Sequence, residues 1–294
     1  MKPLSEWPVA ARSKLIGVFT DIDDTLTTNG IITADALDAL ARLKAAGLHV
    51  IPITGRPVRW SERVALGQPT ATHEVTVNHI AGDIKILPVD AILAENGAVA
   101  LIVNQNSTKL SNNIHSLLLK LYQQDAATRS HNQARMQQVA QRVLREVSGA
   151  VLSQDSGGRE TDIAIDHSEF TQLSADKIAQ VVQIMQSEGM NATVSSIHIN
   201  AWFGAHNKLE GARWIVRELF GRALDAEMDR WVYVGDSTND QLMFEHFPHS
   251  VGVANIRRFE SELTHLPGYI TQSERGAGFA EVARAILASK PCQD

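Results

Sequence analysis

Three carboxylates stand within four positions near the start of the chain. Asp21, Asp23 and Asp24 lie in the stretch FTDIDDTLTTNG, and an apolar run from Leu15 to Phe19 comes just before them. Like charges held this close repel one another, so the group is costly unless a cation offsets it. Carboxylate oxygens are ligands that divalent cations such as Mg²⁺ prefer. The stretch therefore predicts a site for metal-assisted chemistry.

Further along the chain, three more polar stretches contain groups that suit a phosphate and a metal. They are Thr54, Gly55 and Arg56; Lys208; and Asp236, Asn239 and Asp240. Taken singly, each has an ordinary interpretation as a turn, a helix cap or a solvated side chain. Together they place acidic groups, a hydroxyl and a lysine beside predicted strands, and one shared site explains the combination better.

The elements that must position these residues follow an alternating pattern. Short apolar runs at 15–21, 49–55 and 230–236 are typical of buried strands. Segments with apolar residues at helical spacing, such as 33–47 and 208–221, come between or after them. Strands that alternate with helices predict an α/β domain with a parallel sheet. Ligands bind beyond the carboxyl ends of such strands, which is where the acidic residues fall.

The middle of the chain has a different character. Helical spacing at 116–124 and 136–147 predicts two helices, while alternating residues at 161–167 and 192–203 predict strands with one buried face. We therefore expect an inserted α+β domain at 102–204, which divides the core domain into 1–101 and 205–294.

Composition narrows the possible functions. The chain has 294 residues, 44% of them hydrophobic and 20% charged, as in ordinary globular proteins. The net charge of −6 argues against a nucleic-acid partner. A single cysteine, Cys292, excludes an intramolecular disulfide. The start lacks the apolar core of a signal peptide, and we see no membrane span. These features predict a cytoplasmic protein and leave its oligomeric state open.

The ordered motifs DIDDT, ITGR, HNKLEG and GDSTND resemble the four signature motifs of the haloacid dehalogenase superfamily. The insertion after ENGA resembles the large α/β cap of its Cof-like, sucrose-phosphatase-like and phosphomannomutase-like branch. This resemblance implies a Rossmann-like core with a mobile cap. It also implies a Mg²⁺-dependent phosphatase that acts on a small phosphorylated metabolite, expected to be a sugar phosphate.

The resemblance implies a role for each matching residue of the first two motifs. Asp21 is the expected nucleophile, which forms an aspartyl-phosphate, and it is also an expected metal ligand. Asp23 is the expected general acid and base, and its backbone carbonyl is a further metal ligand. Thr54 is expected to donate its hydroxyl to a phosphoryl oxygen.

The last two motifs are expected to provide the positive charge of a lysine and the side chains that bind a metal. Lys208 would offset the negative charge of both the nucleophile and the phosphate. Asp236 would bind Mg²⁺, and either Asn239 or Asp240 would lie on the metal or next to it. Many relatives carry glycine where this chain has Asp24, so we expect that side chain to point away from the phosphate.

Substrate choice is expected to depend on the cap. His198 and Asn200 stand on a predicted polar strand, and Arg159 comes just before another, although a solvated sheet face is the ordinary interpretation of each. In the core, Gly55 and Arg56, which follow the threonine expected to bind phosphate, are further expected substrate contacts, and Arg56 is expected to face the cap.

Three other functions are alternatives to a phosphatase. A phosphosugar mutase would use the same core and is the nearest alternative. A dehalogenase is disfavoured because that chemistry has no use for a proton donor at Asp23. A phospho-acceptor receiver module also combines acidic residues, a threonine and a lysine around Mg²⁺. Receivers are compact single domains, so the long insertion argues against this class.

Overall fold

A computed structural model of the protein describes residues 1–68, 86–103 and 117–290. Most of the stretch 70–90, whose role the sequence left open, lies outside these residues, as does Cys292. Among the described residues, no helix is long and apolar enough to cross a membrane.

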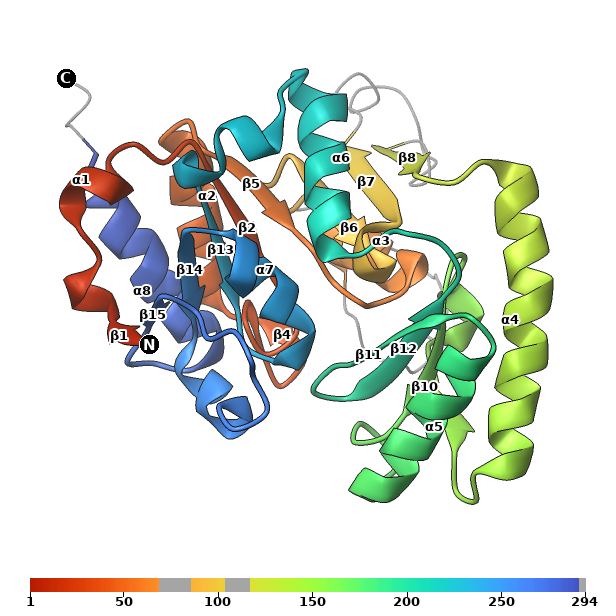
Figure 1. Cartoon of the computed structure of the whole chain (residues 1–294). Coiled ribbons are helices and arrows are strands. Elements are labelled where there is room, and N and C mark those ends of the chain that lie inside the picture. The colour runs from red at the N-terminus through yellow and green to blue at the C-terminus, as the bar shows by residue number, and fades with distance from the viewer. Residues whose placement is uncertain (69–85, 104–116, 291–294) are drawn as a thin grey trace.

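The centre of the core is a six-stranded sheet in which all neighbours are parallel (Figure 1). In sheet order the strands are β1 (Lys2–Pro3), β15 (Tyr269–Ile270), β14 (His249–Gly252), β13 (Trp231–Gly235), β2 (Gly17–Thr20) and β5 (His49–Pro52). The last residue of β2, Thr20, pairs with Val234 on one side and Pro52 on the other. The parallel α/β fold predicted from the sequence is confirmed, and the carboxyl ends of β2, β5 and β13 meet at one edge.

A second, antiparallel sheet continues from β5. It contains β6 (Ala91–Ala94), β7 (Val99–Val103) and β8 (Leu118–Tyr122), and a parallel bridge from Ile53 to Leu93 joins it to the core. The helix predicted at 116–124 is therefore wrong. The run of leucines fits either helix or strand, and the free edge of β7 decides for a strand because the two pair along their whole length.

Helices cover both faces of the central sheet. The α-helices of the core are α1 (Val9–Arg12), α2 (Ala34–Ala45), α3 (Val58–Ala65), α6 (Lys208–Phe220), α7 (Gln241–His246) and α8 (Arg275–Leu287). Neighbouring residues of β2 point to opposite faces. Val18 belongs to the apolar cluster of α2, α3 and α8, and Phe19 to the cluster of α6 and α7. Two separate apolar layers, one on each face of the sheet, therefore fix the edge at which β2, β5 and β13 end.

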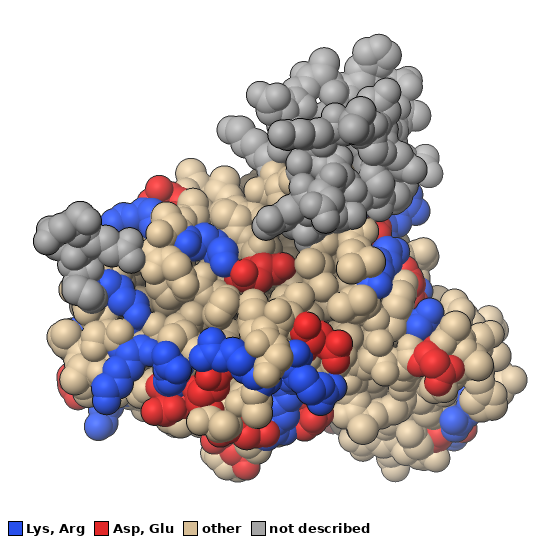
Figure 2. All heavy atoms as spheres, turned by 90° about the horizontal axis from the view of Figure 1, so that it is seen from above, with Lys and Arg blue, Asp and Glu red and all other residues tan. Residues whose placement is uncertain are grey.

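Short elements complete the core. Two-residue strands β3 (Thr27–Thr28) and β4 (Ile31–Ile32) form a hairpin after the acidic stretch. Among the described residues, the 3₁₀ helices of the core are η1 (Leu4–Glu6), η2 (Glu95–Gly97), η6 (Leu224–Ala226), η7 (Met228–Arg230), η8 (Thr238–Asp240) and η9 (Ala254–Phe259), and η5 (Ser156–Gly158) lies outside the core. On the face shown in Figure 2, basic and acidic side chains of the described residues lie interspersed, without a broad basic area.

The remaining elements form a separate layered unit, which we call the cap. Its antiparallel sheet has the order β11 (Asn191–Val194), β12 (His198–Trp202), β10 (Ile163–Asp166) and β9 (Val151–Leu152). Two helices, α4 (Ala126–Glu146) and α5 (Ala175–Ser187), pack on one face of this sheet around their own apolar cluster (Figure 1). The helix predicted at 136–147 is confirmed as part of α4.

The segment 192–203, predicted as one strand, is a hairpin of β11 and β12. Ser195 causes the reversal, since its hydroxyl oxygen accepts from the backbone N–H of His198 at 3.0 Å. The cap limits of 102–204 remain a prediction. Because β8 pairs with the core strand β7, we place the start of the cap after residue 122.

The contact between η2 and α6 leaves no room for a side chain, and this supports a first prediction. A Cβ added at Gly211 would lie 2.7 Å from the Cα of Gly97, where φ is +95°. Gly211→Ala is expected to lower the free energy of unfolding by about 1–3 kcal/mol, the usual cost of overpacking. Urea unfolding followed by circular dichroism measures it. Gly157→Ala is the matched control, because a Cβ there meets nothing within 4 Å. Equal stabilities of the two variants would contradict the close packing.

Candidate active site

Asp21 and Lys208 form a buried ion pair at the carboxyl end of β2. The Lys208 Nζ lies 2.6 Å from Asp21 Oδ1 and 2.6 Å from Asp240 Oδ1. Lys208 is the first residue of α6, and its position is fixed because Asn207 caps that helix. Asp21 and Lys208 are 4% and 3% exposed, so water screens their attraction little. One Asp21 oxygen is thus fixed, and the other faces the cavity described below.

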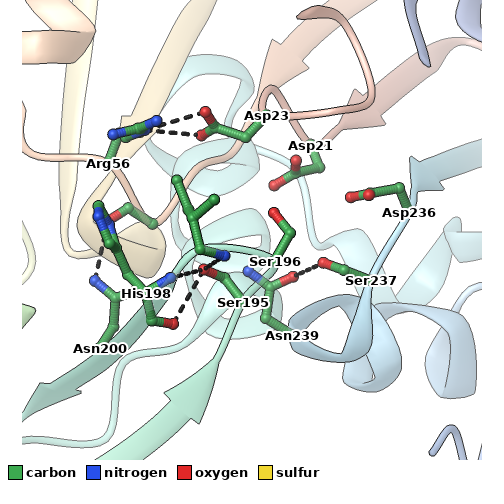
Figure 3. A pocket seen from close by; sticks show the side chains of 12 residues that line it. Asp21, Asp23, Arg56, Ser195, Ser196, His198, Asn200, Asp236, Ser237 and Asn239 are labelled. Carbon is green, nitrogen blue, oxygen red and sulfur yellow. Dashed lines mark hydrogen bonds and ion pairs between the residues drawn. The ribbon is translucent and has the colours of Figure 1, made fainter. Parts of the chain in front are cut away.

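Asp236 follows β13 and faces Asp21 (Figure 3). Its Oδ2 accepts a hydrogen bond from Asn255 Nδ2 at 2.9 Å, but its Oδ1 is buried and has no partner among the residues that the structure describes. Burial raises the pKa of both carboxyls, and the charge of Asp21 raises the pKa of Asp236 further. Two buried carboxylates that face each other with an unpaired oxygen are the arrangement that a cation would stabilise.

The carboxylate oxygens of Asp21 and Asp236 suit Mg²⁺ better than a metal that takes all of its ligands from side chains. Among the described residues, no three His, Cys, Asp or Glu side chains are grouped to hold a metal by themselves. Mg²⁺ commonly takes one or two carboxylates and completes its coordination with water and substrate phosphate. Asp21 and Asp236 fit that pattern.

Asp240 and Asn239, the two further metal candidates, occupy different places. The Asp240 carboxylate accepts from Lys208, from the Tyr233 hydroxyl, and from the backbone N–H groups of residues 236 and 237. With 0% exposure it has no free direction toward a metal, so this geometry favours a role in orienting Lys208. Asn239 lines the cavity, and its Oδ1 accepts from the Ser237 hydroxyl at 3.0 Å.

Asp23, Thr54 and Arg56 meet on the other side of Asp21. The Arg56 Nε lies 3.1 Å from Asp23 Oδ1, and the Thr54 hydroxyl lies 3.4 Å from Asp23 Oδ2. The backbone N–H of Arg56 donates to the Thr54 Oγ1 at 3.0 Å, which closes the turn after β5. The sequence motif therefore places a carboxylate, a hydroxyl and a guanidinium together.

Arg56 also connects the core to the cap. Its Nη2 lies 2.9 Å from Glu169 Oε1, and its Nη1 lies 3.3 Å from Asp155 Oδ2. His198 Nε2 lies 2.8 Å from the other Glu169 oxygen. Arg56 and His198 were expected from the sequence, whereas their acidic partners Glu169 and Asp155 were not. Glu169 closely follows the strand predicted at 161–167, and its place after a strand end was the available signal.

Two expected cap residues hold the Gly55 turn. Arg159 Nη1 and Asn200 Nδ2 both donate to the Gly55 carbonyl, at 3.0 and 3.2 Å. Both also donate to Asp162. Asn200 lines the cavity, whereas Arg159 does not and its side chain is 2% exposed. A role for Arg159 in binding substrate stays a prediction, and this geometry favours a role in holding the turn.

The cavity between core and cap is small. Its volume is about 20 Å³, roughly enough for one water. It is lined by Asp21, Asp23, Gly55, Arg56, Ser195, Ser196, Ile197, His198, Asn200, Asp236, Ser237 and Asn239. The Thr238 hydroxyl donates to the carbonyl of Val194 at 2.8 Å and helps to hold the hairpin against the core. The cap therefore lies closed over the acidic residues.

Asp24 points away from the cavity, as expected. Its φ of +54° is a left-handed conformation that glycine adopts easily and aspartate less so. The carboxylate lies 3.1 Å from Arg275 Nε and 3.5 Å from Arg258 Nη2. These ion pairs explain how this chain accommodates a side chain at a position suited to glycine. Neither arginine was expected from the sequence, and nor was Asn255.

Comparison with known proteins shows which family the chain matches and which solved structures share its fold. A family model of haloacid dehalogenase-like hydrolases matches residues 18–282. A protein from Thermoplasma acidophilum shares the fold with TM-score 0.63 and 13% identity, over 93% of this chain and 98% of its own. The sucrose-phosphatase from Synechocystis, solved with sucrose and phosphate, has TM-score 0.61 and 14% identity, over 92% and 98%.

A subclass IIB sugar phosphatase of the haloacid dehalogenase superfamily also shares the fold, with TM-score 0.57 and 14% identity over 92% of this chain and 98% of its own. A search of curated proteins found no match. At such identities the likeness to these structures concerns the fold, a parallel-sheet core with a second unit, as the sequence predicted.

Proposed function

This chain belongs to the haloacid dehalogenase-like hydrolases, and we propose that it is a Mg²⁺-dependent phosphatase of a small phosphomonoester, with a sugar phosphate as the expected substrate class. The observation that carries the proposal is the buried group of Asp21, Lys208 and Asp236 at the edge of the sheet, with Asp23 beside it. The fold shared with sucrose-phosphatase and with a sugar phosphatase supports the substrate class.

In the first half of the reaction, Asp21 attacks the phosphorus atom with the oxygen that Lys208 leaves free. A bond forms between this oxygen and phosphorus, and the bond from phosphorus to the leaving oxygen breaks. The leaving oxygen takes a proton from Asp23, so the product departs as a neutral alcohol. Lys208 stays on Asp21 Oδ1 and offsets the charge gathered there.

In the second half, water attacks the phosphorus of the aspartyl-phosphate. Asp23 takes a proton from this water, and the bond between Asp21 and phosphorus breaks to release inorganic phosphate. The Arg56 guanidinium holds Asp23 in place through both halves, and the Thr54 hydroxyl, which lies 3.4 Å from Asp23 Oδ2, would turn to donate to a phosphoryl oxygen. The residues that would hold Mg²⁺ are Asp21, the backbone carbonyl of Asp23, and Asp236. When bound, the ion supplies positive charge that neutralises the phosphoryl oxygens and the buried carboxylates.

The cap must open for this substrate to enter. A cavity of about 20 Å³ is too small for a phosphate ester. Opening would separate the Arg56 guanidinium from Glu169 and Asp155, and both carboxylates would then be free to accept from substrate hydroxyl groups. Closing would exclude bulk water from the phosphoenzyme. The limits of the cap as a moving unit remain part of the proposal.

The direct experiment is a screen of the purified chain against a panel of phosphate esters with Mg²⁺. Release of inorganic phosphate from at least one sugar phosphate, faster than from nucleotides or phosphoserine, is the expected result. Conversion of one sugar phosphate into its isomer without phosphate release would support a mutase instead. No turnover of any ester would contradict the proposed activity.

A prediction on specificity follows from the ion pair between cap and core. Glu169→Gln and His198→Ala are expected to reduce kcat/KM for sugar phosphates by about tenfold or more, because each removes a polar contact to the leaving group. Turnover of p-nitrophenyl phosphate should change much less, since its leaving group has no hydroxyl. Glu188→Gln, on the exposed side of the cap, is the matched control. Equal losses on both substrates would show that these residues act in folding or chemistry and not in selection.

A further inference from the structure

A second and larger cavity lies on the other side of Lys208, between the cap hairpin and the start of α6. Its volume is about 280 Å³, against about 20 Å³ at Asp21. Asn96, Thr193, Trp202, His206, Lys208 and Asn239 are among its lining residues. The side chains of Asp21, Asp23, Arg56 and Asp236 line only the smaller cavity. The two cavities are therefore neighbouring compartments that share Asn239.

Two buried polar side chains in this second cavity have atoms without partners. Among the described residues, the Nδ2 of Asn96, which is 3% exposed, finds no hydrogen-bond partner, and neither do the two ring nitrogens of His206, which is 4% exposed. Buried polar groups are almost always paired, because an unpaired one loses its bond to water without a replacement. Three such atoms at one cavity indicate a ligand that would pair with them.

His206 offers a particular pairing pattern. Burial alone lowers its pKa to about 4, so the ring is neutral near pH 7. A neutral imidazole presents one donor and one acceptor, and a hydroxyl group can satisfy either. The ring is held in place by Trp202, which stacks on it with centroids 5.4 Å apart and donates from Nε1 to the His206 carbonyl. This rigid ring suits a hydroxyl-bearing ligand.

The charges around the cavity exclude an ionic ligand. Lys208 is the one ionised side chain among the described residues that line it, and Asp21 and Asp240 already pair with that lysine. The other polar lining groups are His206, amides and a threonine hydroxyl. Neither a phosphate nor a cation would find an unpaired counter-charge here.

We propose that this second cavity binds a neutral polyhydroxylated molecule, a sugar or polyol, through Asn96 and His206. The occupant would lie beside Lys208 but would need no phosphate group. The proposal goes beyond phosphatase activity and does not depend on it, because among the described residues the unpaired nitrogens of Asn96 and His206 form no hydrogen bond with Asp21, Asp23 or Asp236.

The test is ¹⁹F NMR of the whole chain labelled with 5-fluorotryptophan, titrated with glucose, sucrose or trehalose. The Trp202 resonance is assigned from its loss in Trp202→Phe. We expect at least one sugar to shift this resonance saturably, and inorganic phosphate to leave it in place. A shift with phosphate and none with sugars would overturn the proposal in favour of an anion site. No saturable shift with any sugar would mean that the cavity holds only water.

Variants locate the binding. His206→Phe keeps the ring stacked on Trp202 but removes both nitrogens, and it is expected to weaken sugar binding by roughly tenfold or more. His131→Phe, at an exposed position of α4, is the matched control and should bind as the unmutated chain does. If His206→Phe fails to fold, Thr193→Val removes a lining hydroxyl at constant volume and should also weaken binding. Unchanged affinity in the folded variants would overturn the assignment. Since phosphate release is not the readout, an inactive but sugar-binding chain would refute the phosphatase and leave this proposal standing.

Discussion

Asp21→Asn is expected to abolish phosphate release, with kcat reduced by at least about 10⁴-fold. The substitution removes the attacking oxyanion but keeps the size of the side chain. Asparagine still offers one oxygen to the Lys208 ammonium group. We therefore expect the variant to lose the nucleophile while the packing around residue 21 stays unchanged. The measurement is the rate of p-nitrophenyl phosphate hydrolysis at saturating Mg²⁺, with circular dichroism to verify folding.

Asp24→Asn is the matched control for this change. The same substitution is made three residues away, at a carboxylate that lies outside the cavity and that asparagine can replace in the left-handed conformation. Its activity should remain within about tenfold of the unmutated chain, since surface ion pairs contribute little. A folded Asp21→Asn variant that keeps more activity than Asp24→Asn would exclude Asp21 as the nucleophile.

Removal of Mg²⁺ with excess chelator is the second large effect, and we expect it to stop turnover completely. Without the ion, the carboxylates of Asp21 and Asp236 face each other in a buried site that already raises the pKa of both. A phosphate dianion would add to that negative charge. Restored activity on addition of Mg²⁺ is expected, and full activity in chelator would rule out the metal.

Two variants test which of Asp236 and Asp240 binds the metal. Asp236→Asn is expected to raise the Mg²⁺ concentration for half-maximal activity by tenfold or more, because a carboxylate ligand becomes neutral. Asp240→Asn should lower kcat with a smaller change in the Mg²⁺ requirement, because Asp240 contacts Lys208 and Tyr233. The reverse pattern would place Asp240 on the metal and Asp236 in the supporting role.

The parts of the site that the sequence predicted share one property. Asp21, Thr54 and Asp236 each follow a short apolar strand, and parallel strands bring their carboxyl ends to one edge whatever the loops do. Lys208 was named from the motif HNKLEG, and the structure places it at the start of α6, where Asn207 caps the helix. Local patterns were sufficient for these residues, since the position of each depends on a regular element.

The parts that it missed depend on contacts between distant elements. Glu169 and Asp155 become part of the site because the cap folds over Arg56, and no local pattern encodes that contact. Arg159 was named for its place just before a polar strand, yet pairing with Asp162 turns it toward the Gly55 carbonyl. The helix predicted at 116–124 was wrong for a related reason, since this segment contains the strand β8. Its leucines fit a helix equally well, and the free edge of β7 decided the outcome.

The central claim, a covalent phosphoenzyme on Asp21, is tested most directly in Asp23→Asn. This variant keeps the nucleophile but lacks the base that activates water, a loss of about 10²–10⁴-fold in the hydrolysis step. Because p-nitrophenol needs no proton donor to leave, mixing with p-nitrophenyl phosphate should give a burst of about one p-nitrophenol per chain and then slow turnover. Mass spectrometry should find one added phosphoryl group on the peptide that contains Asp21. A phosphoryl group on residue 23 or on a histidine, or no burst in an active variant, would contradict the account.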